Sequence, residues 1–249
     1  MTNVEVEGLR TWFEELGTGE PLALLHGGLA TNATWSEQLP ALSEHFRVLA
    51  PERRAHGHTP DVEGPLSYDD MATDTIGFLE ATVDGPAHLV GWSDGGTVGL
   101  LVAIARPDLV RKLVVIGTSF EARGVTPETQ EFFATLGPDS PELTMFREPY
   151  EAVSPDGPGH WPIAFAKFKE MAATQPQISV EDLSRIDAPT LVLVGDDDMV
   201  RHEHTLSLFR AIPNSELAVV PGASHGVVME KPEIVNRLIL DFIGSSKAI

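Results

Sequence analysis

The sequence predicts an α/β protein with a mostly parallel central sheet flanked by helices. Short apolar runs bounded by turn residues alternate with longer segments of helical spacing along most of the 249 residues. This alternation is typical of parallel strands joined by crossover helices. Several runs are continuously apolar, as in strands that are buried on both faces. The length fits one large domain or a domain with an insertion.

The expected strands follow the apolar runs in order. Leu9–Glu15 and Leu22–Leu25 are separated by the turn-rich stretch 17–21, which is short enough for an antiparallel hairpin. The strands expected further along the chain are Phe46–Ala50, Ala87–Gly91, Val110–Ile116, Thr190–Val194 and Glu216–Val220.

Segments of helical spacing fill the intervals between these strands. Ser67 is followed three residues later by Asp70, a pairing typical of a helix N-terminus. The helices expected from this spacing cover residues 34–44, 67–82, 95–106, 204–212 and 231–243. No repeat with a period of 20 to 50 residues is visible, so the sequence does not predict a solenoid.

The alternation stops at residues 120–186, where Pro and Gly are frequent and no strand pattern is visible. We interpret this stretch as a helical cap inserted into a core that consists of residues 1–119 and 187–249.

One helix of the expected cap carries an aromatic stripe. Trp161, Phe165 and Phe168 are spaced i, i+4 and i+7 along a helix that Pro162 can start. The stripe either packs the cap onto the core or, through Trp161 and Phe165, covers a substrate pocket. The sequence leaves both interpretations open.

Composition excludes several classes of function. The chain has 17 Lys and Arg against 37 Asp and Glu, a net charge of −20, which repels nucleic acid and anionic membranes. The absence of cysteine excludes disulfides and a thiol nucleophile. No basic, apolar leader and no apolar stretch of about 20 residues is visible, so we expect a cytoplasmic protein without a membrane partner. Without a heptad pattern, we expect a monomer or a small homo-oligomer.

The stretch Gly91-Trp92-Ser93-Asp94-Gly95 fits the pattern G-x-S-x-G where an expected strand ends and an expected helix begins. In that context the pattern indicates a nucleophile elbow, a strained turn that projects the serine hydroxyl above the sheet. The glycines allow the close backbone passage that the turn requires. Ser93 is therefore the candidate nucleophile.

A serine hydroxyl needs a base and a group that orients the base. His225 follows the last expected strand, and Asp196, Asp197 and Asp198 follow the strand before it. Carboxylate and imidazole therefore reach the same edge of the sheet as Ser93. The acidic run lacks the dispersed donors of an oxygen-ligand metal site, so we expect no metal.

These stretches together resemble the α/β-hydrolase-fold enzymes over nearly the whole chain. His26-Gly27-Gly28-Leu29 is similar to the family's oxyanion loop, and Glu52–Thr59 resembles its Asp-x-Arg-Gly-His-Gly-x-Ser loop, with Glu for Asp, Ala for Gly and Thr for Ser. The family pattern places the acid three residues after a glycine, which implies Asp198, with Asp197 as the next candidate. The order Ser93, Asp198, His225 is that of this class.

The resemblance implies a serine hydrolase that cleaves a small-molecule ester without a cofactor. His225 would act as the base and Asp198 as its orienting acid, while the backbone N–H groups of Gly28 and Asp94 would form the oxyanion hole. Leu29, Trp92, Trp161 and Phe165 are the candidate pocket residues. A perhydrolase, a lactonase, a carbon–carbon bond hydrolase and a non-hydrolytic ligand sensor stay open as alternatives.

The stretch Trp92–Gly96 is similar to the elbow of valacyclovir-hydrolase-like members, in which the acidic residue after the nucleophile is associated with amine-bearing acyl groups. The Asp94 side chain either has this role or points away from the pocket. Other histidines have structural interpretations: His26 and His56 steady loops, and His202 and His204 are exposed loop residues without a third zinc ligand.

Overall fold

The computed structural model describes residues 2–244, in which the strands form one sheet in the order β1-β2-β4-β3-β5-β6-β7-β8. The pairings β3–β4, β3–β5, β5–β6, β6–β7 and β7–β8 are parallel, and β1–β2 and β2–β4 are antiparallel. The strands are β1 (Thr2–Val6), β2 (Leu9–Leu16), β3 (Pro21–Leu25), β4 (Arg47–Pro51), β5 (Ala87–Trp92), β6 (Val110–Ile116), β7 (Thr190–Asp197) and β8 (Ser215–Ser224). The predicted α/β class with a mostly parallel sheet is confirmed.

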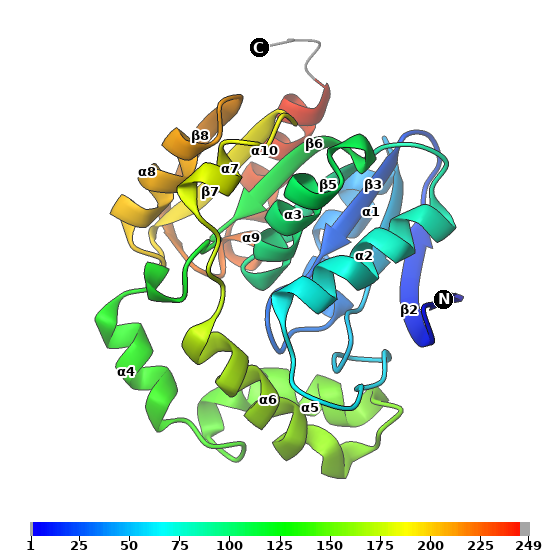
Figure 1. The fold of residues 1–249 in the computed structure, drawn as a ribbon, viewed down its shortest axis with the longest axis vertical. Helices are drawn as coiled ribbons and strands as arrows, with labels where there is room; N and C mark the ends of the chain where they lie inside the picture. The colour runs from blue at the N-terminus through cyan, green and yellow to red at the C-terminus, as the bar shows by residue number, and fades with distance from the viewer. Residues whose placement is uncertain (1, 245–249) are drawn as a thin grey trace.

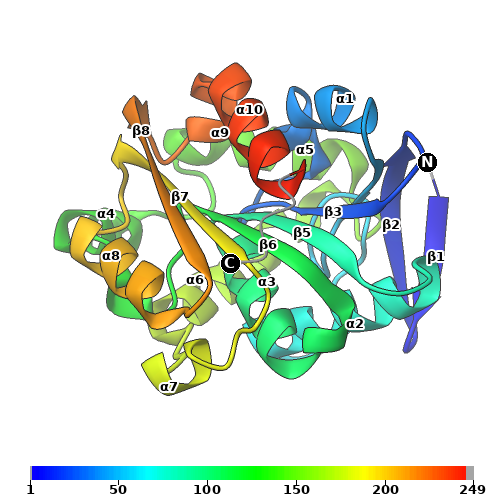
Figure 2. The same ribbon diagram turned by 90° about the horizontal axis from the view of Figure 1, so that it is seen from above.

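Helices cover both faces of this sheet (Figures 1 and 2). One face packs against α1 (Gln38–Ser43), α9 (Val227–Glu230) and α10 (Pro232–Gly244), and the other packs against α2 (Tyr68–Thr82), α3 (Asp94–Ala105) and α8 (His202–Ala211). Each face has its own apolar core because the central strands are buried on both sides. Among the described residues, no helix has the length and apolar character needed to cross a membrane.

The predicted hairpin between the first two apolar runs is wrong. β2 pairs with β1 and β4, whereas β3 lies in the sheet interior between β4 and β5. The hairpin that does form joins β1 to β2 through Glu7 and Gly8, both with positive φ. β3 is buried on both faces. A strand of this kind belongs in the interior of a parallel sheet, with a parallel neighbour on each side, rather than in an antiparallel hairpin at the edge.

The chain between β6 and β7, which we call the cap segment (residues 120–186), contains helices and no strand. Its helices are α4 (Pro127–Thr135), α5 (Thr144–Val153), α6 (Trp161–Thr174) and α7 (Val180–Leu183). α4, α5 and α6 lie away from the sheet, below its strands in Figure 1, whereas α7 packs beside α3 and α8. α6 starts with Trp161 and Pro162, as the sequence predicts.

A nearly buried carboxylate joins the cap segment to the loop after β4. Asp61 Oδ2 accepts hydrogen bonds from Lys167 Nζ at 2.6 Å and His160 Nε2 at 2.9 Å, and the Asp61 side chain is only 6% exposed. Lys167 Nζ also donates to the carbonyl of Val62 at 2.6 Å. Both α6 and the turn before it are thus fixed to the core at one point.

The parallel strands all end at one edge of the sheet. His26 follows β3, Ser93 follows β5, Asp198 follows β7 and His225 follows β8. The carboxyl ends of parallel strands form the common binding edge of open α/β sheets. The candidate catalytic residues therefore meet because of the topology.

We predict that Lys167→Met loosens the cap segment. Removing Lys167 leaves the nearly buried Asp61 carboxylate with the hydrogen bonds from His160 and the Val62 N–H, and costs about 3 kcal/mol. Urea unfolding should show this loss, and thermolysin should cleave the variant first within the cap segment.

Arg237→Met is the matched control because the Arg237–Asp241 pair is exposed at both ends. Its loss should cost less than about 1 kcal/mol. Equal stability and equal cleavage patterns for the Lys167 and Arg237 variants would contradict the anchoring role of Asp61.

Candidate active site

Ser93 lies at a strained turn between β5 and α3. Its φ is 54° and its ψ is −120°, outside the regions that non-glycine residues favour. A Cβ at Gly91 or Gly95 would overlap neighbouring backbone atoms, so this turn requires glycine at both positions. The Ser93 N–H donates to the carbonyl of Ile116 at 2.7 Å, which fixes the turn against β6.

Three side chains form a continuous chain of hydrogen bonds at the edge of the sheet. His225 Nε2 lies 2.9 Å from Ser93 Oγ, and His225 Nδ1 lies 2.9 Å from Asp198 Oδ1. The Asp198 side chain is fully buried and also accepts the backbone N–H of Val200 at 2.9 Å. A carboxylate that accepts Nδ1–H leaves Nε2 as the acceptor for the serine proton.

The structure distinguishes the adjacent aspartates that the sequence left open. Asp196 and Asp197 are exposed, and Asp196 Oδ1 accepts the N–H of Ala223 at 3.2 Å. Asp198 alone of the three reaches His225. Among the described residues, no group of three or more His, Asp and Glu side chains is arranged to hold a metal ion.

The loop after β3, residues 26–29, is held by two neutral imidazoles. His56 Nε2 accepts the N–H of Leu29 at 3.1 Å, while His56 Nδ1 donates to the carbonyl of Arg54. His26 Nδ1 donates to the carbonyl of Gly27, and His26 Nε2 accepts the N–H of Arg53 at 3.1 Å. Both rings fix backbone, in agreement with the structural interpretation of these histidines.

The backbone N–H groups of Gly28 and Asp94 have no hydrogen-bond acceptor in the described part of the chain. Gly28, Ser93 and Asp94 line the same cavity. Asp94 is also the first residue of α3, where backbone N–H groups are unpaired within the helix and favour negative charge. Two donors are thus available beside the serine hydroxyl.

Trp92 joins the loops on the two sides of Ser93. Its Nε1–H donates to the carbonyl of His225 at 2.8 Å, and its ring lies against Gly27, where a Cβ would come within 2.7 Å. The indole therefore holds the histidine loop and the loop after β3 at a fixed separation.

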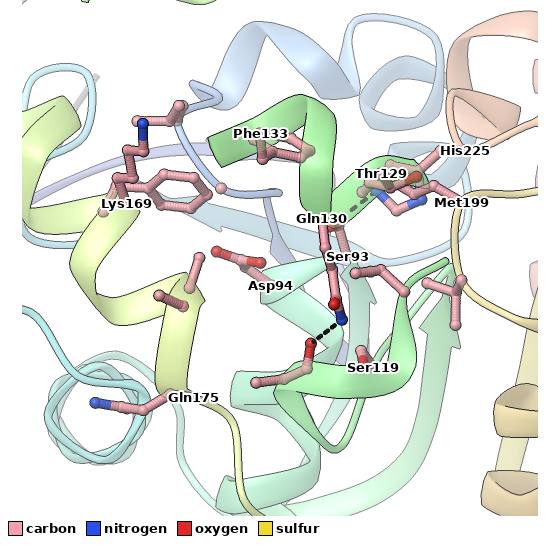
Figure 3. Close-up of a pocket in the computed structure, with 18 of the residues that line it drawn as sticks. Ser93, Asp94, Ser119, Thr129, Gln130, Phe133, Lys169, Gln175, Met199 and His225 are labelled. Atoms are coloured by element: carbon pink, nitrogen blue, oxygen red, sulfur yellow. Dashed lines mark hydrogen bonds between the residues drawn. The ribbon is translucent and has the colours of Figure 1, made fainter. Parts of the chain in front are cut away.

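A cavity of about 720 Å³ opens beside Ser93 between the core and the cap segment (Figure 3). Its walls are mostly apolar. Leu29, Trp92 and Phe165 line it, as expected. Tyr68, Phe133, Phe168, Lys169 and Met199 also line it, although no sequence pattern predicted them. These residues come from segments whose orientation relative to Ser93 is set by tertiary packing, for which no local sequence signal exists.

The assignment of Trp161 to the pocket is wrong. Trp161 is 1% exposed and does not line the cavity. Its Nε1–H donates to the carbonyl of Pro138 at 2.8 Å, and its ring packs against Tyr150. The first residue of the aromatic stripe therefore belongs to the interior of the cap segment, and Phe165 and Phe168 reach the cavity one and two turns later.

The Asp94 carboxylate faces the cavity, so its side chain does not point away (Figure 3). Burial raises its pKa, while the nearby Arg53 charge and a hydrogen bond from the Tyr68 hydroxyl oppose that rise. A Cβ at Gly28 would lie 2.5 Å from Asp94 Oδ2. A carboxylate therefore stands directly beside one of the two backbone donors.

His204 is buried, which corrects its assignment as an exposed loop residue. α8 begins at His202, so His204 lies in the first turn of that helix and faces the core. Its Nε2 accepts the N–H of Phe120 at 3.1 Å, and its ring stacks on Phe120. His202 is exposed, as expected, but lies in the helix.

Comparisons with known proteins find a hydrolase family model and individual hydrolases that are similar to this chain. The family model described as "Alpha/beta hydrolase family" matches residues 22–238. The chain is 29% identical to a 2-hydroxy-6-oxo-2,4-heptadienoate hydrolase of Pseudomonas putida, over 98% of this chain and 99% of that protein. It is 27% identical to the mouse serine hydrolase BPHL, over 96% of this chain and 85% of that protein. A solved esterase from Thermogutta terrifontis superimposes with a TM-score of 0.78 at 26% identity, covering 98% of both chains.

We predict that stability falls as the pH is lowered from 6.5 to 4.5. Burial lowers the pKa of His56 to about 3 and of His204 to about 4, whereas both titrate near 6.5 in an unfolded chain. In that window the unfolded state binds more protons, so the free energy of unfolding decreases with decreasing pH. Each histidine contributes about 2 to 3 kcal/mol of loss by pH 4.5.

His204→Gln keeps an acceptor for the Phe120 N–H but removes one titration. Urea unfolding at pH 7.0, 5.5 and 4.5 should show a smaller decrease for this variant than for the wild type. His45→Gln, at an exposed position, is the control. An unchanged pH slope in the His204 variant would show that this imidazole does not contribute to acid sensitivity.

Proposed function

Because the chain belongs to the alpha/beta hydrolase family, we propose that it is a serine hydrolase that cleaves a small-molecule carboxylic ester through an acyl-enzyme. The observation that carries this proposal is the hydrogen-bond chain from Ser93 through His225 to Asp198. The net charge of −20 supports a small molecule, rather than a nucleic acid or an anionic membrane, as the partner.

The proposed reaction has two acyl-transfer steps. His225 Nε2 accepts the proton of Ser93 as the serine oxygen attacks the ester carbonyl, and Asp198 holds the imidazole in the required tautomer. The imidazolium then gives this proton to the departing alcohol. A water molecule, deprotonated by His225, then attacks the acyl-enzyme, and the imidazolium returns its proton to Ser93 Oγ as the acid leaves. In both steps the N–H groups of Gly28 and Asp94 donate to the carbonyl oxygen as it gains negative charge.

The cavity favours an apolar acyl or alcohol group without negative charge. Its walls contain Leu29, Phe133, Phe165 and Phe168. The partly buried Asp94 carboxylate would repel an anionic group beside Gly28, such as that of the dienoate named for the Pseudomonas putida relative. Lys169, a cation in the cavity wall, is engaged by the carbonyls of Ala134 and Leu136. Neutral esters and esters with an amine on the acyl group fit this charge. Peracid formation and lactone opening use the same three side chains, and product analysis distinguishes them.

Ser93→Ala should lower kcat for p-nitrophenyl butyrate by at least about a thousandfold, since a serine nucleophile contributes up to about a millionfold in related hydrolases. Asp198→Asn should lower kcat by up to about 10⁴-fold through the wrong imidazole tautomer.

Asp197→Asn is the matched control for Asp198, because Asp197 is exposed and adjacent in sequence. It should keep the wild-type rate. Substantial turnover by Ser93→Ala would contradict the proposed nucleophile. A single stoichiometric burst followed by silence in the wild type would instead favour a ligand sensor.

If Asp94 binds an amine of the acyl group, the wild type should prefer the benzyl ester of valine to that of 3-methylbutanoic acid at pH 6.5. The two esters differ only in the α-amino group. One favourable charge pair corresponds to about a tenfold ratio in kcat/KM. Asp94→Asn should abolish this preference, and equal kcat/KM values for the two esters in the wild type would refute amine selection.

A further inference from the structure

Arg53 is a buried cation directly behind the loop that carries Gly28. The residue is 3% exposed and does not line the cavity. Its Nη1 donates to the carbonyl of His26, and its Nη2 donates to the carbonyl of Gly27 at 3.1 Å. Within residues 2–244, its Nε has no acceptor and no carboxylate forms an ion pair with it. Burial lowers the Arg53 pKa to about 10, so the guanidinium keeps its charge at neutral pH.

The hydrogen bond from Arg53 Nη2 to the Gly27 carbonyl sets the direction of the Gly28 N–H. In a trans peptide the carbonyl and the following N–H point in opposite directions. Arg53 holds the Gly27 carbonyl from the buried side, so the N–H of Gly28 points toward the opposite, cavity side. His26 Nδ1 donates to the same carbonyl at 2.8 Å and supports this orientation.

The charge of Arg53 addresses an unfavourable feature of the site. The Asp94 carboxylate stands beside Gly28, where an oxyanion would form. Two neighbouring negative charges repel each other more strongly in a mostly apolar cavity than in water. Arg53 lies behind the loop. Among the groups that favour the ionised Asp94 carboxylate, its buried positive charge has the largest effect.

We propose that Arg53 is a positioning residue for the oxyanion site, which aims the Gly28 N–H at the reacting carbonyl and offsets the negative charge of Asp94. This inference rests on the proposed serine-hydrolase function. In the Glu52–Thr59 stretch, Arg53 occupies the position written x in the family motif, so the motif itself does not require it.

The experiment compares Arg53→Met and Arg53→Lys with Arg54→Lys in p-nitrophenyl butyrate hydrolysis. Removing one oxyanion donor lowers kcat by about 10² to 10³, so misaiming it should cost about 10- to 100-fold in Arg53→Met, with KM within about twofold of the wild type. Arg53→Lys keeps the charge but cannot donate to both carbonyls as a guanidinium does. Its kcat should therefore lie between those of the wild type and Arg53→Met. Arg54 pairs with Asp74 of α2, and neither residue lines the cavity, so Arg54→Lys should keep kcat.

A transition-state analogue separates positioning from general damage. Butylboronic acid forms a tetrahedral anion on a serine and needs the same donors as the reaction. Its inhibition constant should rise in Arg53→Met by the factor by which kcat/KM falls. Adding Asp94→Asn to Arg53→Met should restore several-fold of the lost kcat, because the uncompensated carboxylate is gone.

Three outcomes would overturn the inference: a kcat of Arg53→Met no lower than that of Arg54→Lys, an unchanged boronate inhibition constant, or no recovery in the double variant. If Arg53→Met does not fold, the same comparisons are made with Arg53→Lys. Failure of the proposed function has a different signature, since the wild type itself would then not exceed Ser93→Ala. Boronate binding, followed by calorimetry, still tests Arg53 in that case because it needs no turnover.

Discussion

The site depends on the strained backbone of Ser93. A non-glycine residue with φ of 54° costs about 1 to 3 kcal/mol, and such a conformation persists only where the surroundings enforce it. Here the enforcement comes from the glycines at positions 91 and 95 and from the hydrogen bond between Ser93 N–H and Ile116. The central parallel strands supply the rigid frame. The remaining residues of the site only have to reach a hydroxyl whose position is already set.

The sequence predicted the parts of the fold that local patterns encode. The expected strand Val110–Ile116 ends in the apolar run Leu113–Ile116, and its bounds agree with the structure. Pairing order is not local, which is why the hairpin between β2 and β3 was expected wrongly. β1 was missed although Val4 and Val6 alternate with polar residues, because a short edge strand gives a weak signal.

The same division applies to the site. The positions of Ser93, Asp198 and His225 at strand ends follow from motif and topology, and the structure brings them into hydrogen-bond contact. The cavity walls do not follow, because they depend on how α6 is rotated over the core. Trp161 and Phe165 share a helical face, yet only Phe165 lines the cavity. Trp161 donates a hydrogen bond to the carbonyl of Pro138 and is buried inside the cap segment.

The buried charges explain why the neighbourhood of Ser93 is polar inside an apolar cavity. Asp94 is partly buried in the cavity wall and is stabilised by the Tyr68 hydroxyl and by the charge of Arg53 rather than by a direct ion pair. A direct ion pair would use the acceptor oxygens of the Asp94 carboxylate and would leave none of them for a ligand. Separation by the backbone of residues 26–28 instead leaves the carboxylate open to the cavity, while the cation polarises the peptide group that carries the Gly28 N–H. The fold therefore keeps an acidic pocket residue compatible with a neighbouring site for developing negative charge.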